Sequence, residues 1–106
     1  MVSEVADHGG PSVASRMFAV IDGSTTSTSA HSLSRRDRSL VTLASLVTGG
    51  HDDEIGMHVR AAITNGVTRD EISETILHTS IYAGVPAANA AFAIAREVFA
   101  QLDDVD

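Results

Sequence analysis

The chain has 106 residues, with neither cysteine nor tryptophan, and its 14 acidic and 7 basic residues give a formal net charge of −7. This length fits one domain. The lack of cysteine excludes disulfides, thiolate zinc sites and thiol redox catalysis. The lack of a basic stripe argues against nucleic-acid binding. Because no apolar run is long enough to cross a bilayer, we expect a soluble cytoplasmic protein without membrane partners.

The first third of the sequence, residues 1–32, reads as an arm. Apolar residues recur at helical spacing between Ser12 and Asp22, which predicts one short helix there. The tract Gly23–Ser32 consists of small and polar residues without apolar periodicity, so we expect a flexible linker. The domain proper is therefore predicted to occupy residues 33–106.

Clear helix signals begin at Ser34, which forms a capping-box pattern with Asp37. The helix that follows is apolar around much of its circumference and should end at Gly49-Gly50. Asp52 or Asp53 is expected to cap the next helix. Its buried stripe is predicted to comprise Ile55, Val59, Ala62, Ile63 and Gly66.

Two further helices are predicted after residue 67. Thr68 and Glu71 form a full capping box, and Gly84 and Pro86 mark the end of one helix and the first turn of the next. The inward faces are predicted to comprise Ile72, Ile76, Leu77, Ser80 and Ala83, then Phe92, Ala95, Val98, Phe99 and Leu102. The predicted fold class is therefore all-α, with four well-signalled helices and a weaker N-terminal one.

Glu54 and His58 are the clearest candidates for catalytic residues in this sequence. Four residues apart on a helix, they share one face. His58 adjoins Val59, which belongs to the buried stripe, so we expect the imidazole at the rim of the packed face. A carboxylate beside an imidazole raises its pKa and orients its tautomer, which makes a general acid or base. The alternative is a structural pair on the helix surface, which would stabilise the helix by only a few tenths of a kcal/mol.

Four further residues are candidates for binding a substrate. Arg38 and Arg60 could hold anions near His58, while His78 and Tyr82 could donate hydrogen bonds to a developing oxyanion. His78 could equally be a core histidine, and Tyr82 could simply span an interface. His51, Glu54, His58 and His78 are suitable metal ligands, but no HxH or HExxH spacing occurs, so we expect no metal.

Three tracts, Arg38–Ala44, His58–Ile72 and Ile81–Phe92, closely resemble the carboxymuconolactone decarboxylase family. The resemblance runs from about Leu33 to Leu102. It implies an alkylhydroperoxidase D-like helical bundle of four to five helices that assembles as trimers or hexamers. Related peroxidases use a CxxC pair followed by histidine. Here those positions are held by His51, Glu54 and His58, so the thiol-dependent peroxidase reaction is excluded.

The resemblance implies cofactor-independent decarboxylation of a carboxylated lactone, 4-carboxymuconolactone, to 3-oxoadipate enol-lactone in protocatechuate degradation. Our hypothesis assigns the proton to His58, its tuning to Glu54, the carboxylate anchor to Arg38, and hydrogen bonds to Tyr82 or His78. Members of this type usually carry a tryptophan-containing helix ahead of the site and often a cysteine where this chain has Ala83. Two alternatives therefore stay open: a catalytically weakened homologue that binds a small acid, and a related lyase or isomerase with another substrate.

Overall fold

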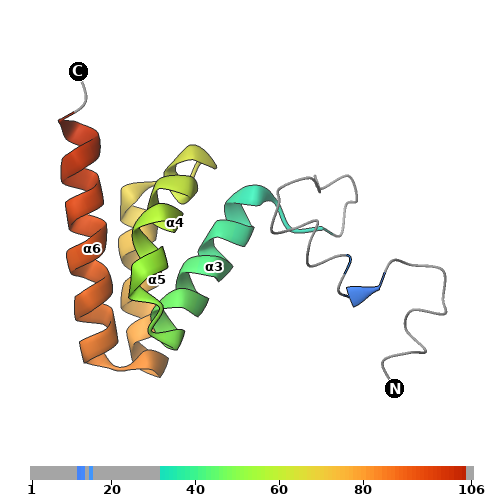
Figure 1. The fold of residues 1–106 in the computed structure, drawn as a ribbon, viewed down its shortest axis with the longest axis horizontal. Coiled ribbons are helices and arrows are strands. Elements are labelled where there is room, and N and C mark those ends of the chain that lie inside the picture. The colour runs from blue at the N-terminus through green and yellow to red at the C-terminus, as the bar shows by residue number, and fades with distance from the viewer. Residues whose placement is uncertain (1–11, 14, 16–31, 105–106) are drawn as a thin grey trace. The chain divides into compact units, whose positions relative to one another are not determined.

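The computed structural model describes residues 12–13, 15 and 32–104, and a compact unit begins at Leu33. Within this unit the chain forms four helices, α3 (Arg35–Gly49), α4 (Asp52–Thr64), α5 (Arg69–Ala83) and α6 (Val85–Asp103) (Figure 1). None of the residues described here forms a strand, so the predicted all-α class is confirmed. The predicted N-terminal helix and linker fall, apart from residues 12–13, 15 and 32, outside the described residues.

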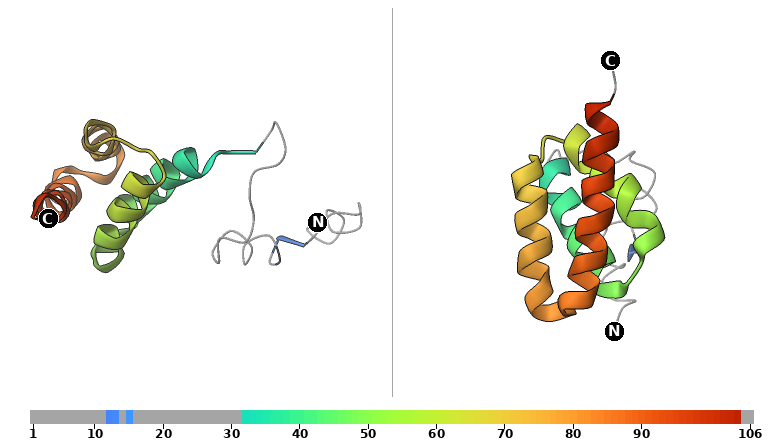
Figure 2. Two further views of the ribbon diagram at one scale, coloured as in Figure 1. Left: turned by 90° about the horizontal axis from the view of Figure 1, so that it is seen from above. Right: turned by 90° about the vertical axis from the view of Figure 1, so that its left-hand side faces the viewer.

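The four helices form a bundle in which each helix runs opposite to the one before it in the chain (Figures 1 and 2). The closely packed pairs are α3 with α4, α3 with α5, α4 with α6 and α5 with α6. The pairs α3–α6 and α4–α5 therefore lie across the diagonals of the bundle. This arrangement puts α3 between α4 and α5, which matters for the candidate site below.

The helix boundaries follow from local backbone chemistry. The Ser34 hydroxyl accepts a hydrogen bond from the Asp37 amide at 3.0 Å, and Gly50, whose φ of 73° is left-handed, caps the C-terminal end of α3. Thr68 and Glu71 form both hydrogen bonds of the capping box that the sequence predicts. Gly84, with φ of 94°, separates α5 from α6.

The cap of α4 differs from the prediction. Its N-cap residue is His51, whose side chain makes no capping hydrogen bond, and Asp52 and Asp53 lie within the first turn. Acidic side chains there are still favourable, because they face the positive end of the helix dipole. They therefore stabilise the start of α4 by charge, without capping it through a hydrogen bond.

Small and branched apolar side chains fill the interior, as the composition predicts. Each helix presents a stripe to the centre, and α6 contributes mainly alanines, which let its neighbours approach closely. The buried apolar residues are Leu43, Val47, Ile55, Val59, Ala62, Val67, Ile72, Ile76, Ala88, Ala91, Ala95 and Val98. No helix in the described part of the chain combines the length and apolarity needed to cross a membrane.

One stretch of the surface is unusually apolar. Leu77, Ile81 and Tyr82 at the end of α5 and Val85 at the start of α6 are 56%, 72%, 76% and 65% exposed. We call these four residues the α5 apolar surface. The prediction that Leu77 faces inward is wrong, because Ile76 takes the inward position and the next residue is rotated by about 100° around the helix. Gly66, predicted in the buried stripe of α4, is likewise exposed, in the turn after that helix.

Candidate active site

His58 stands at the edge of the packed face of α4. The fully buried Ile55 and Val59 fix the rotation of the helix, and His58, next to Val59, is half-buried. Glu54, one turn earlier, is exposed and belongs to the acidic first turn. Among the described residues, no hydrogen bond or ion pair joins Glu54 to His58. The two side chains therefore share one helix face, as predicted, without a hydrogen bond or ion pair between them.

The flank of α4 that carries His58 faces α3. Asn65, seven residues after His58 and so on nearly the same side of the helix, donates a hydrogen bond to the Ser39 hydroxyl of α3 at 3.0 Å. This bond also fixes the antiparallel register of the two helices. Two turns back along α4, His58 then lies level with the region of Leu46 in α3.

His78 and Tyr82 lie on the opposite side of α3. Arg36 of α3 forms an ion pair with Glu71 of α5, which identifies the flank of α5 that faces α3. His78 and Tyr82 follow Glu71 by two and three turns on nearly that flank. Their rings pack edge to face, with centroids 5.8 Å apart and planes at 62°. Both residues are exposed.

The register of these contacts puts Tyr82 and His58 at similar levels along α3, on its two sides. Figure 1 shows that α5 runs in the same direction as α3. Counting eleven residues on from the Arg36–Glu71 pair along both helices therefore puts Tyr82 level with the region of Val47. The width of α3 separates Tyr82 from His58 by about 10 Å or more. Within one chain, the predicted hydrogen-bond donors and the imidazole therefore lie at similar levels along α3 but on its opposite flanks.

The two predicted arginines lie apart from His58 in a single chain. Arg38 is half-buried in the first turn of α3. It lies about eight residues before the level of His58, which corresponds to about 12 Å along the helix. Arg60 lies on the other flank of α4, where its guanidinium donates a hydrogen bond to the Gln101 side chain of α6. Neither guanidinium is therefore beside the imidazole.

Three hollows of the described unit are lined by residues other than His58. One of about 400 Å³ surrounds the start of α4, from Gly50 to Glu54, and one of about 180 Å³ lies between α5 and α6. A third, of about 440 Å³, lies between α4 and α6. Among the residues that the structure describes, no three histidine or carboxylate side chains gather as a metal site would require.

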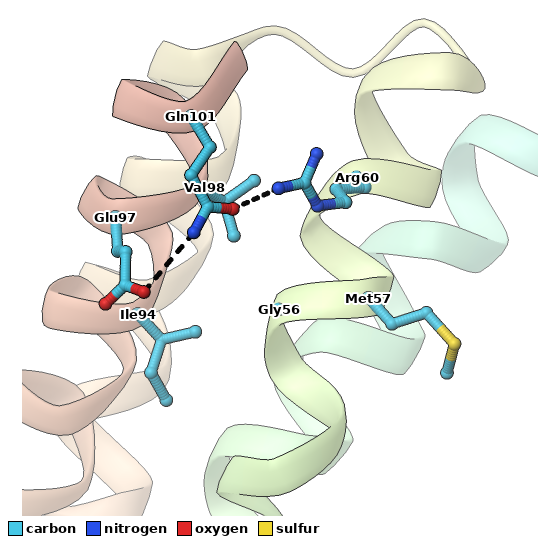
Figure 3. A pocket seen from close by; sticks show the side chains of 7 residues that line it. All are labelled: Gly56, Met57, Arg60, Ile94, Glu97, Val98 and Gln101. Carbon is cyan, nitrogen blue, oxygen red and sulfur yellow. Dashed lines mark hydrogen bonds between the residues drawn. The ribbon is translucent and has the colours of Figure 1, made fainter. Parts of the chain in front are cut away.

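The hollow between α4 and α6 is a feature that the sequence predictions missed. We call it the α4–α6 groove. Figure 3 shows Arg60 and Gln101 reaching toward one another across it, with Glu97 next to Gln101. Its lining comprises Gly56, Met57, Arg60, Ile94, Glu97, Val98 and Gln101. The one signal in the sequence is Gly56, a glycine in the middle of a helix where no turn requires it.

The chain is similar over most of its described unit to known decarboxylases. The model of the carboxymuconolactone decarboxylase family matches residues 11–97. A 4-carboxymuconolactone decarboxylase of Acinetobacter baylyi is 57% identical over 70 residues, covering 66% of this chain and 52% of that protein. A nitrosuccinic acid decarboxylase of Metarhizium robertsii is 38% identical over 72 residues, covering 68% of this chain and 50% of that protein.

A further relative carries no assigned activity. It is an uncharacterized 15.0 kDa protein of Paracoccus denitrificans, 35% identical over 74 residues, with 68% of this chain and 55% of that protein covered. The chain thus spans about half the length of the curated relatives it matches. The family match itself covers most of the sequence, including part of the predicted arm. On this match and the all-α bundle, the chain belongs to the carboxymuconolactone decarboxylase family.

Proposed function

We propose that the chain is a carboxy-lyase that converts 4-carboxymuconolactone to 3-oxoadipate enol-lactone in the breakdown of protocatechuate. Its similarity to a decarboxylase named for that substrate supports the proposal. The observation that carries it is the half-buried His58, with the carboxylate of Glu54 one turn away on the α3-facing flank of α4. Such a pair can deliver a proton at a partly desolvated position.

The reaction needs one proton donor and stabilisation of one anion. When the carbon–carbon bond to the departing carboxylate breaks, CO2 leaves and the electron pair spreads over the lactone ring to its carbonyl oxygen. The imidazolium of His58 then gives its proton to the carbon next to that carbonyl, which forms the new C–H bond and the enol-lactone. His58 recovers a proton from water. Because the conjugated carbonyl accepts the electron pair, the step requires no metal or organic cofactor.

The other roles follow from charge and hydrogen-bonding capacity. Glu54, one turn before His58 on the same face of α4, supplies a carboxylate that helps to orient the imidazole. Arg38 binds the carboxylate that the substrate retains, and Tyr82 or His78 donates a hydrogen bond to the developing oxyanion. Arg60 has no part in this reaction, since its guanidinium is directed to α6.

In this proposal the site is completed by further copies of the chain, in a homotrimer or homohexamer. Two observations support that part. In one chain the backbone of Arg38 lies about 12 Å along α3 from the level of His58, and the width of α3 separates Tyr82 from His58, as described above. The α5 apolar surface also lies on the helix that carries His78 and Tyr82, and an apolar surface of this kind is typical of a protein–protein contact.

A second candidate function is binding of a small acid with little or no turnover. It is favoured by the exposure of Tyr82, 76%, since efficient decarboxylation requires that water be excluded from the carbanion. A related lyase acting on another acid is the remaining alternative, and it is consistent with the similarity to a nitrosuccinic acid decarboxylase.

Loss of the ultraviolet absorbance of 4-carboxymuconolactone on adding purified protein separates these functions. We expect turnover by the native chain and a fall in kcat of about 10²- to 10⁴-fold in His58→Ala, because the general acid is lost. Arg96→Gln, which removes an exposed charge on α6, serves as the matched control and should keep the native rate. Unchanged turnover in a folded His58→Ala protein would contradict the assignment. Absence of turnover with saturable binding would favour the acid-binding alternative.

A further inference from the structure

The α4–α6 groove is a hollow in the packing of two helices that otherwise fit closely. Its volume of about 440 Å³ lies within the range of about 300–1,000 Å³ typical of small-molecule sites. Its floor is apolar, formed by Ile94 and Val98 of α6 where they face Gly56 of α4 (Figure 3). It lies on the flank of α4 that faces α6, whereas His58 lies on the flank that faces α3.

Gly56 keeps this groove open, and neither its backbone nor the helix packing explains the glycine. The described glycines with positive φ are Gly50, Gly66 and Gly84, so Gly56 has an ordinary helical conformation. A Cβ added to it would lie 3.7 Å from Ile94 Cγ2 and 3.7 Å from Val98 Cγ2, which is ordinary van der Waals contact. A glycine in a helix interior costs about 1 kcal/mol relative to alanine. The missing side chain of Gly56 leaves space next to the apolar floor, and this space is what the less stable residue provides.

A hydrogen-bonded row of polar side chains forms the rim. Arg60 donates to Gln101 Oε1, and Gln101 Nε2 donates to Glu97 Oε1 at 3.3 Å (Figure 3). Among the residues that the structure describes, no carboxylate forms an ion pair with Arg60. The guanidinium at one end of the rim is therefore bonded to a neutral amide, which a stronger acceptor such as a carboxylate can replace.

We infer that the α4–α6 groove binds a small monocarboxylic acid with an apolar, aromatic or branched, body. The carboxylate takes the place of the Gln101 amide oxygen on the Arg60 guanidinium, whose planar fork matches both carboxylate oxygens. The body of the ligand covers Ile94 and Val98. Glu97, at the other end of the rim, repels a second carboxylate, so this site discriminates against dicarboxylates. It thereby differs from the proposed reaction site, whose substrate carries two carboxylates.

Titration of the full chain with benzoate, followed by amide chemical shifts and calorimetry, tests the inference. We expect saturable binding, with the largest shifts at Gly56, Arg60 and Gln101. Arg60→Gln should weaken binding about tenfold or more, since a charge-assisted hydrogen bond is lost. Gly56→Leu should abolish it by filling the floor. Gly56→Ala, whose added methyl the packing accepts, should weaken binding in a chain whose fold is kept.

Three controls make the result specific. Benzamide, which has the same shape without the charge, and succinate, which has a second carboxylate, should both bind at least tenfold more weakly than benzoate. Arg96→Gln removes an equal charge from α6 outside the groove and should leave benzoate affinity unchanged. Absence of benzoate binding would overturn the inference. So would an equal loss in Arg60→Gln and Arg96→Gln, or shifts confined to the flank that carries His58.

Discussion

The two ends of α5 differ in how many of their side chains find partners within the single chain. At the first turn, the Thr68–Glu71 capping box is joined by the Arg36–Glu71 ion pair, and Arg69 binds Asp103 at 2.7 Å. The Arg69 guanidinium also lies 5.1 Å above the centre of the Phe99 ring. Three helices therefore meet at this end through paired charges and a closed cap.

The last turns of α5 show the reverse. Leu77, Ile81 and Tyr82 are more than half exposed, and Val85 extends the same apolar surface into α6. The described contacts there are local ones, such as the edge-to-face packing of His78 and Tyr82. The comparison shows that side chains at one end of this helix are paired within the chain, whereas the other end leaves large apolar side chains exposed. The proposed hydrogen-bond donors, His78 and Tyr82, lie at the end with the exposed apolar side chains.

The largest expected effect is on assembly, through Ile81→Asp. If copies of the chain associate through the α5 apolar surface, a charge placed there becomes buried in the contact. The free-energy cost of burying an unpaired charge then exceeds what association gains. We expect sedimentation analysis to give a multiple of 11.1 kDa for the native chain and a monomer for the variant.

Met57→Asp is the matched control for assembly. Met57 is 61% exposed on α4, so its replacement should leave the native mass unchanged. A native chain that is already monomeric, or an Ile81→Asp protein of native mass, would show that the exposed end of α5 does not bind further copies.

A smaller effect, on stability, distinguishes neighbouring residues of α5. Ile76 is fully buried and Leu77 is 56% exposed. In the Ile81→Asp background, where assembly should not contribute, Ile76→Ala should lower the free energy of unfolding by about 2–5 kcal/mol, and Ile76→Val by about 1 kcal/mol. Leu77→Ala should change it by less than about 0.5 kcal/mol. Urea unfolding measures all three, and a comparable loss from Leu77→Ala would mean that this side chain is packed within the fold.

The sequence was sufficient for the helices because their ends and stripes depend on nearby residues. Thr68, Glu71, Gly84 and Pro86 mark their positions by local hydrogen bonding and backbone conformation alone. Periodicity failed at Leu77, where two adjacent apolar residues compete for one inward position. Only packing against the other helices decides which of them is buried.

The site was less predictable, because it depends on how the helices meet. The row of Glu54 and His58 follows from their spacing, but the helix that this row faces is fixed by the Asn65–Ser39 bond, between residues 26 apart in sequence. The prediction grouped Arg60 with His58 by closeness in the chain. Two residues along a helix correspond to a rotation of about 200°, so the two side chains lie on different flanks. The α4–α6 groove could not be predicted from local sequence either, because the hydrogen bond across it joins residues 41 apart in the chain.

The smallest expected effect concerns acid stability at the first turn of α5. A hydrogen bond from the Thr68 amide, aided by the charge of Arg36, lowers the pKa of Glu71 in the folded chain below its ordinary value. The unfolded chain therefore takes up the proton at higher pH than the folded chain does. The stabilisation by ionised Glu71 is therefore fully present above the ordinary pKa of a glutamate and is lost as the pH falls through the lower pKa of the folded chain.

Glu71→Gln isolates this contribution, because its amide oxygen can still accept the Thr68 hydrogen bond while the titrating charge is gone. We expect thermal melting between pH 7 and pH 3 to depend less steeply on pH in the variant than in its parent, again in the Ile81→Asp background. Asp103→Asn is the matched comparison, since Arg69 lowers the pKa of Asp103 in the same direction. If Glu71→Gln kept the full acid dependence, the charge at this end of α5 would contribute nothing to folding, and the capping hydrogen bonds alone would account for its order.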